Sequence, residues 1–233
     1  RGLGDVYKRQ YEHLRGTAYA ALDPSHRLNR DIINIEKAPR NKNGLVEYST
    51  TVEIYRPINM HRWNKAIYHT VPNRGGAGAG ERVLLEMGFA LVRVGWQGDI
   101  PGNQKNIVAS LPVARNADST SIHGPAIEEF IFNDSSHTSR ARLTYPLASQ
   151  TVTQGNLTVR QHQRDPRQTP MDLKWRAVNL NEIEIQRPSA FDGGAIYEFT
   201  YIAKDPIVMG LGSVSYTHLS CRRRLRCRSR WSP

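Results

Sequence analysis

KAIYHTVPNRGGAGAGERVLLEMGFALVRVGW, residues 65–96, contains the strongest structural signal in the chain. It begins with an apolar run typical of a strand, and a glycine-rich loop follows at residues 72–80. Residues 81–87 have the pattern of a short helix that Gly88 ends, and residues 89–96 have the pattern of a buried strand. Strand, loop, helix and strand in this order predict one βαβ unit with two parallel strands.

An antiparallel hairpin is predicted upstream of this unit. Residues 45–55 (LVEYSTTVEIY) alternate apolar and polar side chains, which is the period of a strand with one buried face. Residues 31–38 (DIINIEKA) are the expected partner strand. The segment from Asn41 to Gly44 favours a turn between them, because Asn and Gly adopt positive φ at low cost.

The chain changes character after residue 105. Strand-like runs such as AIEEFIF, RARLTYPL, NEIEIQ and AIYEFTYIA are separated there by Pro, Gly, Asn and Ser. We therefore expect residues 11–105 to form the first part of an α/β core, with a β-rich insertion at residues 106–204 and the start of a core helix at residues 205–212. The predicted fold class is α/β, a partial sheet built from the hairpin and the βαβ unit.

The two ends of the chain are related to each other through their codons. Asp5 to Gln10 can be encoded by GAT GTG TAT AAG AGA CAG, and the reverse complement in a shifted frame encodes Val214 to Leu219. Such an inverted repeat resembles a transposon end used in sequencing libraries. We therefore expect residues 1–10 and 213–233 to be adaptor-derived, and the natural protein to be cut at both sides.

The formal net charge of +11 would suggest a nucleic-acid partner. However, the C-terminal tail supplies much of it, with Arg222, Arg223, Arg224, Arg226, Arg228 and Arg230. Because this tail is expected to be non-native, nucleic acid is not the expected partner.

No metal, cofactor or membrane span is expected. Both cysteines, Cys221 and Cys227, lie in the tail, and the histidines of the body lack the close spacing of a zinc motif. No stretch is long and apolar enough to span a bilayer. The compartment stays open, because a signal peptide would be lost with the true N-terminus.

The glycine-rich loop has three interpretations. A dinucleotide site needs G-x-G-x-x-G, and Gly76 and Gly78 begin that pattern, but Glu81 stands at the third glycine position and disfavours it. An oxyanion loop uses backbone N–H groups to stabilise a tetrahedral intermediate. Its candidates are Asn73, Arg74, Gly75 and Gly76. A plain surface turn fits the spacing equally well.

Several motifs in the same order resemble a family of largely uncharacterised bacterial α/β-hydrolase-domain proteins. The motifs are YEHLRGTAYAALDP (11–24), APRNKNGLVEYST (38–50), NRG (73–75), GWQGD (95–99), HGP (123–125), LTVR (157–160) and YIAKDPIVMGLG (201–212). The resemblance implies a serine hydrolase parent, esterase-like, that acts on a small-molecule ester. It places the nucleophile elbow, the acid and the histidine beyond residue 212, so this chain is expected to be inactive alone.

A second candidate region follows the last strand of the βαβ unit. Ligands bind at the carboxyl ends of parallel strands, so Trp96, Gln97, Gly98 and Asp99 are expected to line a substrate pocket. A different class of function also fits the chain, namely a β-rich carbohydrate-binding or structural module in which the glycine loop is only a turn. Under the truncated-core interpretation, an open sheet edge makes self-association the expected behaviour of the chain.

Overall fold

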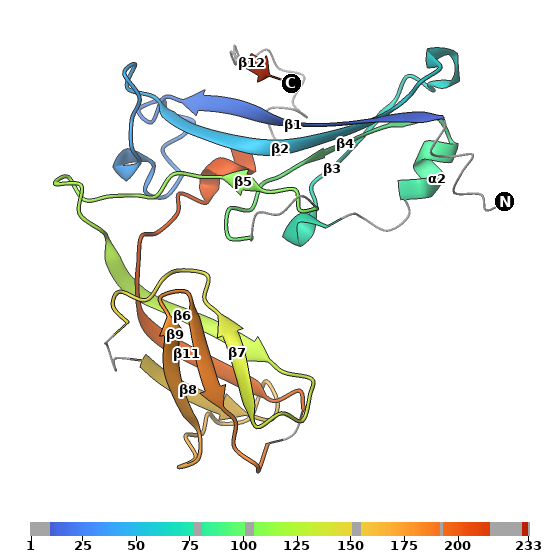
Figure 1. The fold of residues 1–233 in the computed structure, drawn as a ribbon. Helices are drawn as coiled ribbons and strands as arrows, with labels where there is room; N and C mark the ends of the chain where they lie inside the picture. The colour runs from blue at the N-terminus through green and yellow to red at the C-terminus, as the bar shows by residue number, and fades with distance from the viewer. Residues whose placement is uncertain are drawn as a thin grey trace. The chain divides into compact units, whose positions relative to one another are not determined.

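The computed structural model describes residues 10–76, 81–100, 105–150, 155–191, 193–214 and 230–232. The chain divides into two compact units. Unit 1 consists of Arg1–Ala114 with Ile207–Pro233, and unit 2 is the continuous segment Arg115–Pro206. Figure 1 shows the strands and helices of each unit.

Unit 1 is built on a mixed sheet whose strands lie in the order β12-β1-β2-β4-β3, with β5 also paired to β2. The strands are β1 (Tyr11–Leu22), β2 (Val46–Pro57), β3 (Ile67–Thr70), β4 (Ala90–Val94), β5 (Ala109–Ser110) and β12 (Arg230–Ser232). β1 and β2 are antiparallel and paired along their whole lengths, from Tyr11 opposite Pro57 to Leu22 opposite Val46. These two strands are the longest of the sheet.

The hairpin predicted from residues 31–38 is wrong in one of its two strands. β2 is present, but its antiparallel partner is β1, and the segment before β2 forms turns and the 3-10 helix η1 (Ile35–Lys37). The reason is the spacing of the buried side chains. Ile32, Ile35 and Ala38 are buried at intervals of three, while Ile33 is 79% exposed. That period belongs to a tight helical turn rather than to a strand.

The βαβ unit is present as predicted from the sequence. β3 and β4 are parallel, from Ile67 opposite Ala90 to Thr70 opposite Arg93. Between them lie the 3-10 turn η3 (Asn73–Gly75) and the helix α2 (Glu81–Glu86). Gly88 ends α2 with φ +82, and a Cβ there would lie 2.5 Å from the carbonyl oxygen of Arg62, so only glycine fits.

The predicted α/β class is nevertheless wrong, because strands dominate the described residues. α2 has six residues, and the other α-helical residues described are 210–214. Helices this short cannot cover both faces of a parallel sheet, as an α/β fold requires. Apart from β3 and β4, the strand pairs found among the described residues are antiparallel. The chain is therefore a β-rich protein.

Unit 2 contains two three-stranded antiparallel sheets, in the orders β7-β10-β9 and β6-β11-β8. The strands are β6 (His123–Ile131), β7 (Thr138–Arg142), β8 (Gly155–Arg160), β9 (Lys174–Asn179), β10 (Glu182–Gln186) and β11 (Ile196–Lys204). Side chains of both sheets meet in one hydrophobic cluster, so the unit is a β-sandwich.

Alternation along β11 builds this core. Tyr197, Phe199 and Tyr201 point inward and are at most 3% exposed, while the residues between them face outward. The Phe199 ring packs edge-on against Trp175 of the opposite sheet, with ring centroids 4.6 Å apart. The inward face of the sheet β6-β11-β8 is thus covered by the second sheet.

Candidate functional site

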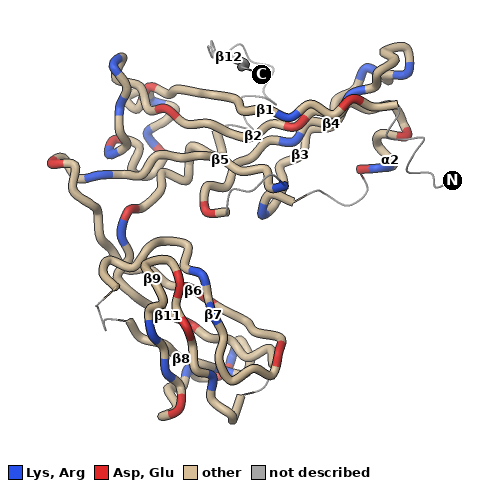
Figure 2. The backbone as a smooth tube through the Cα atoms, viewed as in Figure 1, with Lys and Arg blue, Asp and Glu red and all other residues tan. Residues whose placement is uncertain are grey.

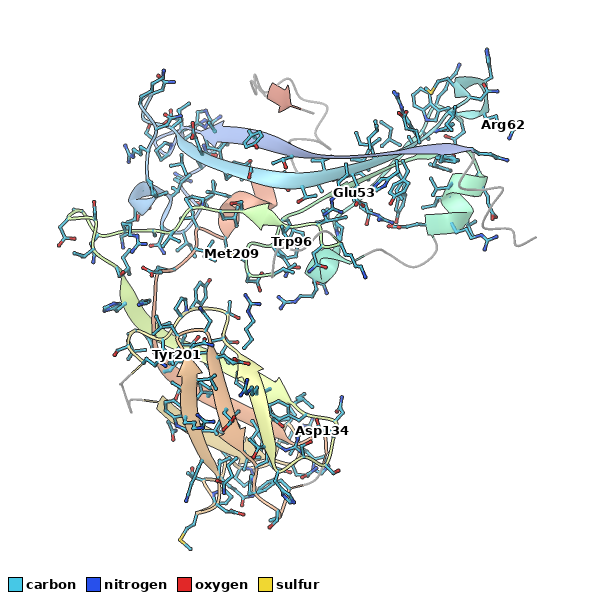
Figure 3. The ribbon with its side chains drawn as sticks, in the orientation of Figure 1. Glu53, Arg62, Trp96, Asp134, Tyr201 and Met209 are labelled. Atoms are coloured by element: carbon cyan, nitrogen blue, oxygen red, sulfur yellow. The ribbon has the colours of Figure 1, made fainter. Side chains whose placement is uncertain are left out.

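The two candidate regions predicted from the sequence lie together in unit 1. η3 follows the carboxyl end of β3, and residues 96–99 follow the carboxyl end of β4. Because β3 and β4 are parallel neighbours, both segments leave the sheet at the same edge. Figure 3 labels Trp96 at this place.

Three hydrogen bonds connect the segments. The backbone N–H of Arg74 donates to Oε1 of Gln97 over 2.6 Å, and the Arg74 guanidinium contacts Oδ2 of Asp99 at 2.6 Å. The indole N–H of Trp96 donates to the carbonyl oxygen of Pro72 over 2.9 Å. Gln97 is buried, so its bond to Arg74 is shielded from water.

The loop backbone is held in an unusual conformation. Arg74 and Gly75 both have positive φ, 53° and 73°. A Cβ on Gly75 would lie 3.0 Å from the carbonyl oxygen of Ile107, whose own N–H donates to Gly75 O over 3.1 Å. The N–H of Gly76 donates to Asn73 O over 3.3 Å. Among the oxyanion candidates, the N–H groups of Arg74 and Gly76 are therefore already paired.

Two polar atoms of unit 1 are buried without a hydrogen-bond partner among the described residues, Oδ1 of Asp99 and Nε2 of His69. Burial lowers the pKa of His69 below its usual value, because desolvation disfavours the charged imidazolium. The ring is therefore neutral at neutral pH.

The sequence did not indicate a row of charged residues that crosses the sheet of unit 1. Glu53 of β2 stands opposite Arg15 of β1 and Arg93 of β4, and it contacts their guanidinium nitrogens at 2.5 and 3.0 Å. Arg93 also pairs with Glu81 at the start of α2. Only 6% of the Glu53 side chain is exposed. Figure 3 labels Glu53 in the middle of the sheet.

Aromatic contacts extend this row. His13 stacks on Tyr55 with ring centroids 4.3 Å apart, and its Nε2 lies 3.4 Å from a carboxylate oxygen of Glu53. The Arg93 guanidinium lies 5.1 Å from the centre of the Tyr55 ring. One signal was present in the sequence, the alternation of residues 45–55, which places Glu53 on the same face as Tyr55. The partners from β1 and β4 were not predictable.

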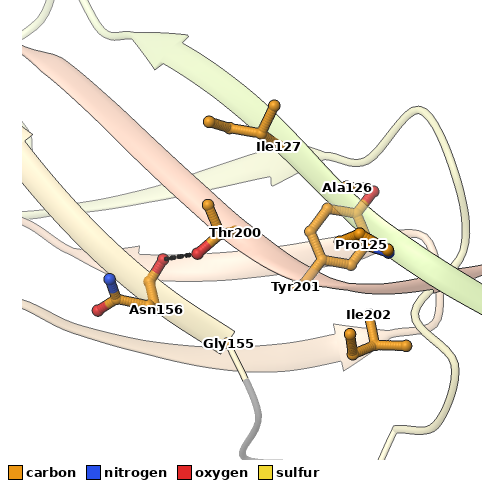
Figure 4. Close-up of a pocket in the computed structure, with 8 residues that line it drawn as sticks. All are labelled: Pro125, Ala126, Ile127, Gly155, Asn156, Thr200, Tyr201 and Ile202. Carbon is orange, nitrogen blue, oxygen red and sulfur yellow. Dashed lines mark hydrogen bonds between the residues drawn. The ribbon is translucent and has the colours of Figure 1, made fainter.

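Unit 2 contains a pocket of about 590 Å³ on the outward face of the sheet β6-β11-β8. It is lined by Pro125, Ala126, Ile127, Gly155, Asn156, Thr200, Tyr201 and Ile202, as Figure 4 shows. Ile127, Thr200 and Asn156 stand side by side on β6, β11 and β8. Ile127 is 61% exposed, so this face presents an aliphatic side chain beside a hydroxyl and an amide.

A second pocket of about 460 Å³ shares Pro125, Ala126 and Ile127 with the first. Its lining includes residues 122–128 without interruption, and it continues to Thr144, Tyr145, Ala203, Lys204 and Pro206. A strand contributes consecutive residues to one pocket when its backbone edge, rather than one face, forms the wall. The second pocket therefore follows the N-terminal half of β6 and extends to the end of β11.

Ion pairs lie on the outward face of the sheet β6-β11-β8, at the end away from the first pocket. Arg167 contacts both carboxylate oxygens of Glu198, at 2.6 and 2.8 Å, and Arg160 lies 3.4 Å from Glu129. The hydrogen bond from Arg167 lowers the pKa of the Glu198 carboxyl. Figure 2 shows such neighbouring charges of opposite sign on the strands. These groups satisfy one another and leave the aliphatic end of the face open.

The described residues contain no group of three His, Cys, Asp or Glu side chains placed to hold a metal ion. Within the same residues, no helix has the length and apolarity needed to cross a membrane. Comparisons with protein-family models, curated proteins and solved structures find no match to this chain. Function is therefore inferred from the geometry of the chain's own residues.

Proposed function

We propose that this chain is a β-rich binding module whose ligand surface lies on the outward face of the sheet β6-β11-β8. The observation that carries the proposal is the pair of pockets that share Pro125, Ala126 and Ile127. Binding sites in proteins are concave and largely apolar, with a few polar groups that orient the ligand. This surface has that composition.

The exposed isoleucines provide the driving force. Ile127 is 61% and Ile202 is 37% exposed, and both line the first pocket. Complete burial of such a side chain contributes about 1.5–3 kcal/mol, so partial cover of two of them supports weak to moderate affinity. Asn156 and Thr200 supply the hydrogen bonds that orient the ligand.

The pocket favours an aliphatic ligand over a sugar ring. Sugar rings stack on exposed aromatic faces, and the aromatic lining residue Tyr201 is only 3% exposed. Its hydroxyl donates to Tyr145 O over 2.9 Å, within the core. Carbohydrate binding is therefore the less favoured form of this proposal.

The test is an amide chemical-shift titration of the isotopically labelled chain with 1-hexanol and, separately, with N-acetylglucosamine. We expect hexanol to shift Ile127 and Thr200, and the effect to be lost in Ile127→Lys. Ile131→Lys is the matched control, because Ile131 lies on the same strand and face, is 53% exposed and does not line the pocket. A response to the sugar alone would replace the aliphatic ligand by a carbohydrate. No response to either compound would overturn the proposal.

A second candidate function, the oxyanion loop of an esterase-like site, is favoured by one observation. The loop after β3 and the segment after β4 meet at the carboxyl ends of two parallel strands, where open sheets bind ligands. Because the N–H groups of Arg74 and Gly76 are paired, the donors left for an oxyanion among the four candidates are the N–H groups of Asn73 and Gly75. The nucleophile and its base would come from outside the described residues.

Methylphosphonate, an anion that imitates a tetrahedral intermediate, tests this second candidate. We expect it to shift the Gly75 amide resonance in the whole chain and in Arg74→Ala, which lacks the guanidinium that could hold the anion by itself. If neither the Asn73 nor the Gly75 amide responds at saturating methylphosphonate, the loop has a structural role only.

A further inference from the structure

We infer that one end of the unit 1 sheet binds the surface of a lipid bilayer that contains anionic lipids. This inference is independent of the ligand surface proposed for unit 2. Two loops form this end: residues 58–66 lead into the amino end of β3, and residues 87–89 lead into the amino end of β4. Because β3 and β4 are parallel neighbours, both loops lie at the same end of the sheet. Figure 3 labels Arg62 there.

Hydrogen bonds hold the two loops together. The backbone N–H of Asn64 donates to Gly88 O over 3.0 Å, and its side-chain amide donates to Met87 O over 3.1 Å. Within the first loop, the side chain of Asn59 accepts the N–H of His61 over 3.0 Å. The loops are therefore ordered before they meet a partner, which keeps the entropic cost of binding low.

Three long apolar side chains of these loops are exposed to water. Ile58 is 63%, Met60 is 52% and Met87 is 60% exposed, and we call these three side chains the apolar tip. The pocket of about 290 Å³ beside them is lined by Met87 but by neither Ile58 nor Met60. Exposed apolar groups next to polar residues mark a surface for a protein or a membrane. A bilayer suits them, because it covers side chains that lie outside a pocket without needing a complementary shape.

Positive charge accompanies the apolar tip. His61, Arg62 and Lys65 are exposed in the same loop, and Figure 2 shows the Lys and Arg of this loop in blue. The sequence has no Asp or Glu between Glu53 and Glu81. The loop therefore presents cations without an acidic residue of its own.

The acidic residues of the neighbouring elements already contact other arginines. Glu86 of α2 pairs with Arg82 at 3.0 Å, and Glu12 of β1 pairs with Arg56 at 2.7 Å. None of the ion pairs found among the described residues involves Arg62. The positive charge of the loop is thus left to attract an anionic surface.

An anionic bilayer satisfies both parts of this end of the sheet. The apolar tip enters the boundary between headgroups and acyl chains, and the cations stay beside the lipid phosphates. A polynucleotide would attract the cations but leave the apolar tip in water. An apolar protein surface would cover the tip but has no need of the cations. The combination therefore favours the bilayer.

The experiment measures co-sedimentation of the full chain with sucrose-loaded vesicles of phosphatidylcholine alone or mixed equally with phosphatidylglycerol. The arginines of the C-terminal tail also attract anionic vesicles, so every variant keeps the tail. We expect Ile58→Asn with Met60→Asn to weaken binding to the mixed vesicles at least about tenfold. Leu28→Asn with Ile33→Asn is the matched control, because these side chains are 58% and 79% exposed in the segment between β1 and β2.

A second pair of variants tests the charges. We expect Arg62→Ser with Lys65→Ser to weaken binding to the mixed vesicles at least about fivefold. Its control is Arg27→Ser with Lys42→Ser, which removes the same charge from exposed positions before β2 and should change nothing. Hydrogen-exchange mass spectrometry locates the contact in the unchanged chain, where residues 58–64 should exchange more slowly on the mixed vesicles.

Each outcome decides the inference. Weakening by both loop variants and by neither control, with slower exchange of residues 58–64, supports it. Binding that neither loop variant weakens belongs to the arginines of the tail and overturns it. Weakening by the charge variant alone identifies a surface for polyanions in general, and weakening by the apolar variant alone identifies a surface that does not recognise anionic lipid. Either result overturns the inference, as does an absence of binding to the mixed vesicles.

Discussion

The backbone N–H of Arg74 donates to the side-chain oxygen of Gln97 over 2.6 Å, and this bond joins the loop after β3 to the segment after β4. Gln97 is buried, and Arg74 has a φ of 53° that an L-residue adopts only at some cost. The buried side chain therefore holds a backbone conformation that the loop sequence alone would not favour.

Removal of this side chain should loosen the loop. In Gln97→Ala the Arg74 N–H loses its acceptor in a region shielded from water, and we expect a loss of about 1–3 kcal/mol in the free energy of unfolding. Urea denaturation measures the change. Gln150→Ala is the control, since Gln150 makes an exposed bond to Val178 O, and its cost should be smaller. Equal costs in the two variants would contradict a bracing role for Gln97.

The row of charges in unit 1 should be sensitive to its central carboxylate. Glu53→Gln leaves Arg15 and Arg93 facing each other without the anion between them, and we expect a loss of about 3 kcal/mol because the carboxylate is buried. Glu12→Gln removes an exposed pair with Arg56 and should cost less than about 1 kcal/mol. Thermal or urea unfolding compares the two; a Glu53→Gln variant as stable as Glu12→Gln would show that the row is not energetically important.

His69 gives unit 1 a pH dependence with a definite sign. Its pKa in the folded chain is lowered by burial, so the unfolded chain binds the proton more readily. The stabilisation is fully present above the unfolded value of about 6.5 and is lost as the pH falls through that value toward the lower folded pKa. We expect His69→Gln to flatten the pH dependence of the free energy of unfolding between about pH 7 and pH 5. A ring titration of His69 by NMR with a midpoint above about 6.5 would refute this.

Among the described residues, β3 has a neighbouring strand on one side only, and this edge makes self-association the expected behaviour of the chain. β3 lies at the end of the sheet order, Ile67 and Tyr68 are 62% and 43% exposed, and the strand contains neither proline nor a Lys, Arg, Asp or Glu side chain. Sedimentation velocity over a range of concentrations should show association that Ile67→Lys reduces. Ile33→Lys changes a similarly exposed isoleucine in a turn and should have no such effect. A chain that sediments as a monomer at every concentration would contradict this prediction.

The sequence predicted elements whose signals are local. The βαβ unit was recognisable because residues 65–96 contain, in order, a strand pattern, a glycine loop, a helix pattern and a second strand pattern. The contact between Arg74 and Gln97 was not predicted. β1 was missed because its sequence, YEHLRGTAYAAL, has several alanines and a glycine, which are weak strand formers. The strand predicted at residues 31–38 was wrong. Ile33 completes an apolar–polar alternation in the sequence, but its side chain is exposed in the structure.

The predicted fold class failed because it depended on long-range pairing. One βαβ unit was identified correctly, but nothing local showed that the other strands would pair antiparallel. The same limitation applies to the binding surface. The alternation of β6 predicts a strand with Ile127 on one face, whereas the exposure of that face depends on its place at the end of the sheet β6-β11-β8.

Hydrogen exchange at the amide of Ile127 tests the proposed binding surface most directly. The amide lies on β6, the outermost strand of the sheet β6-β11-β8, and Ile127 is a lining residue of both pockets. We predict that saturating 1-hexanol slows its exchange, while the amide of buried Leu157 on β8 is unaffected. An Ile127 amide whose exchange rate does not change at saturating 1-hexanol would contradict a ligand surface at this place.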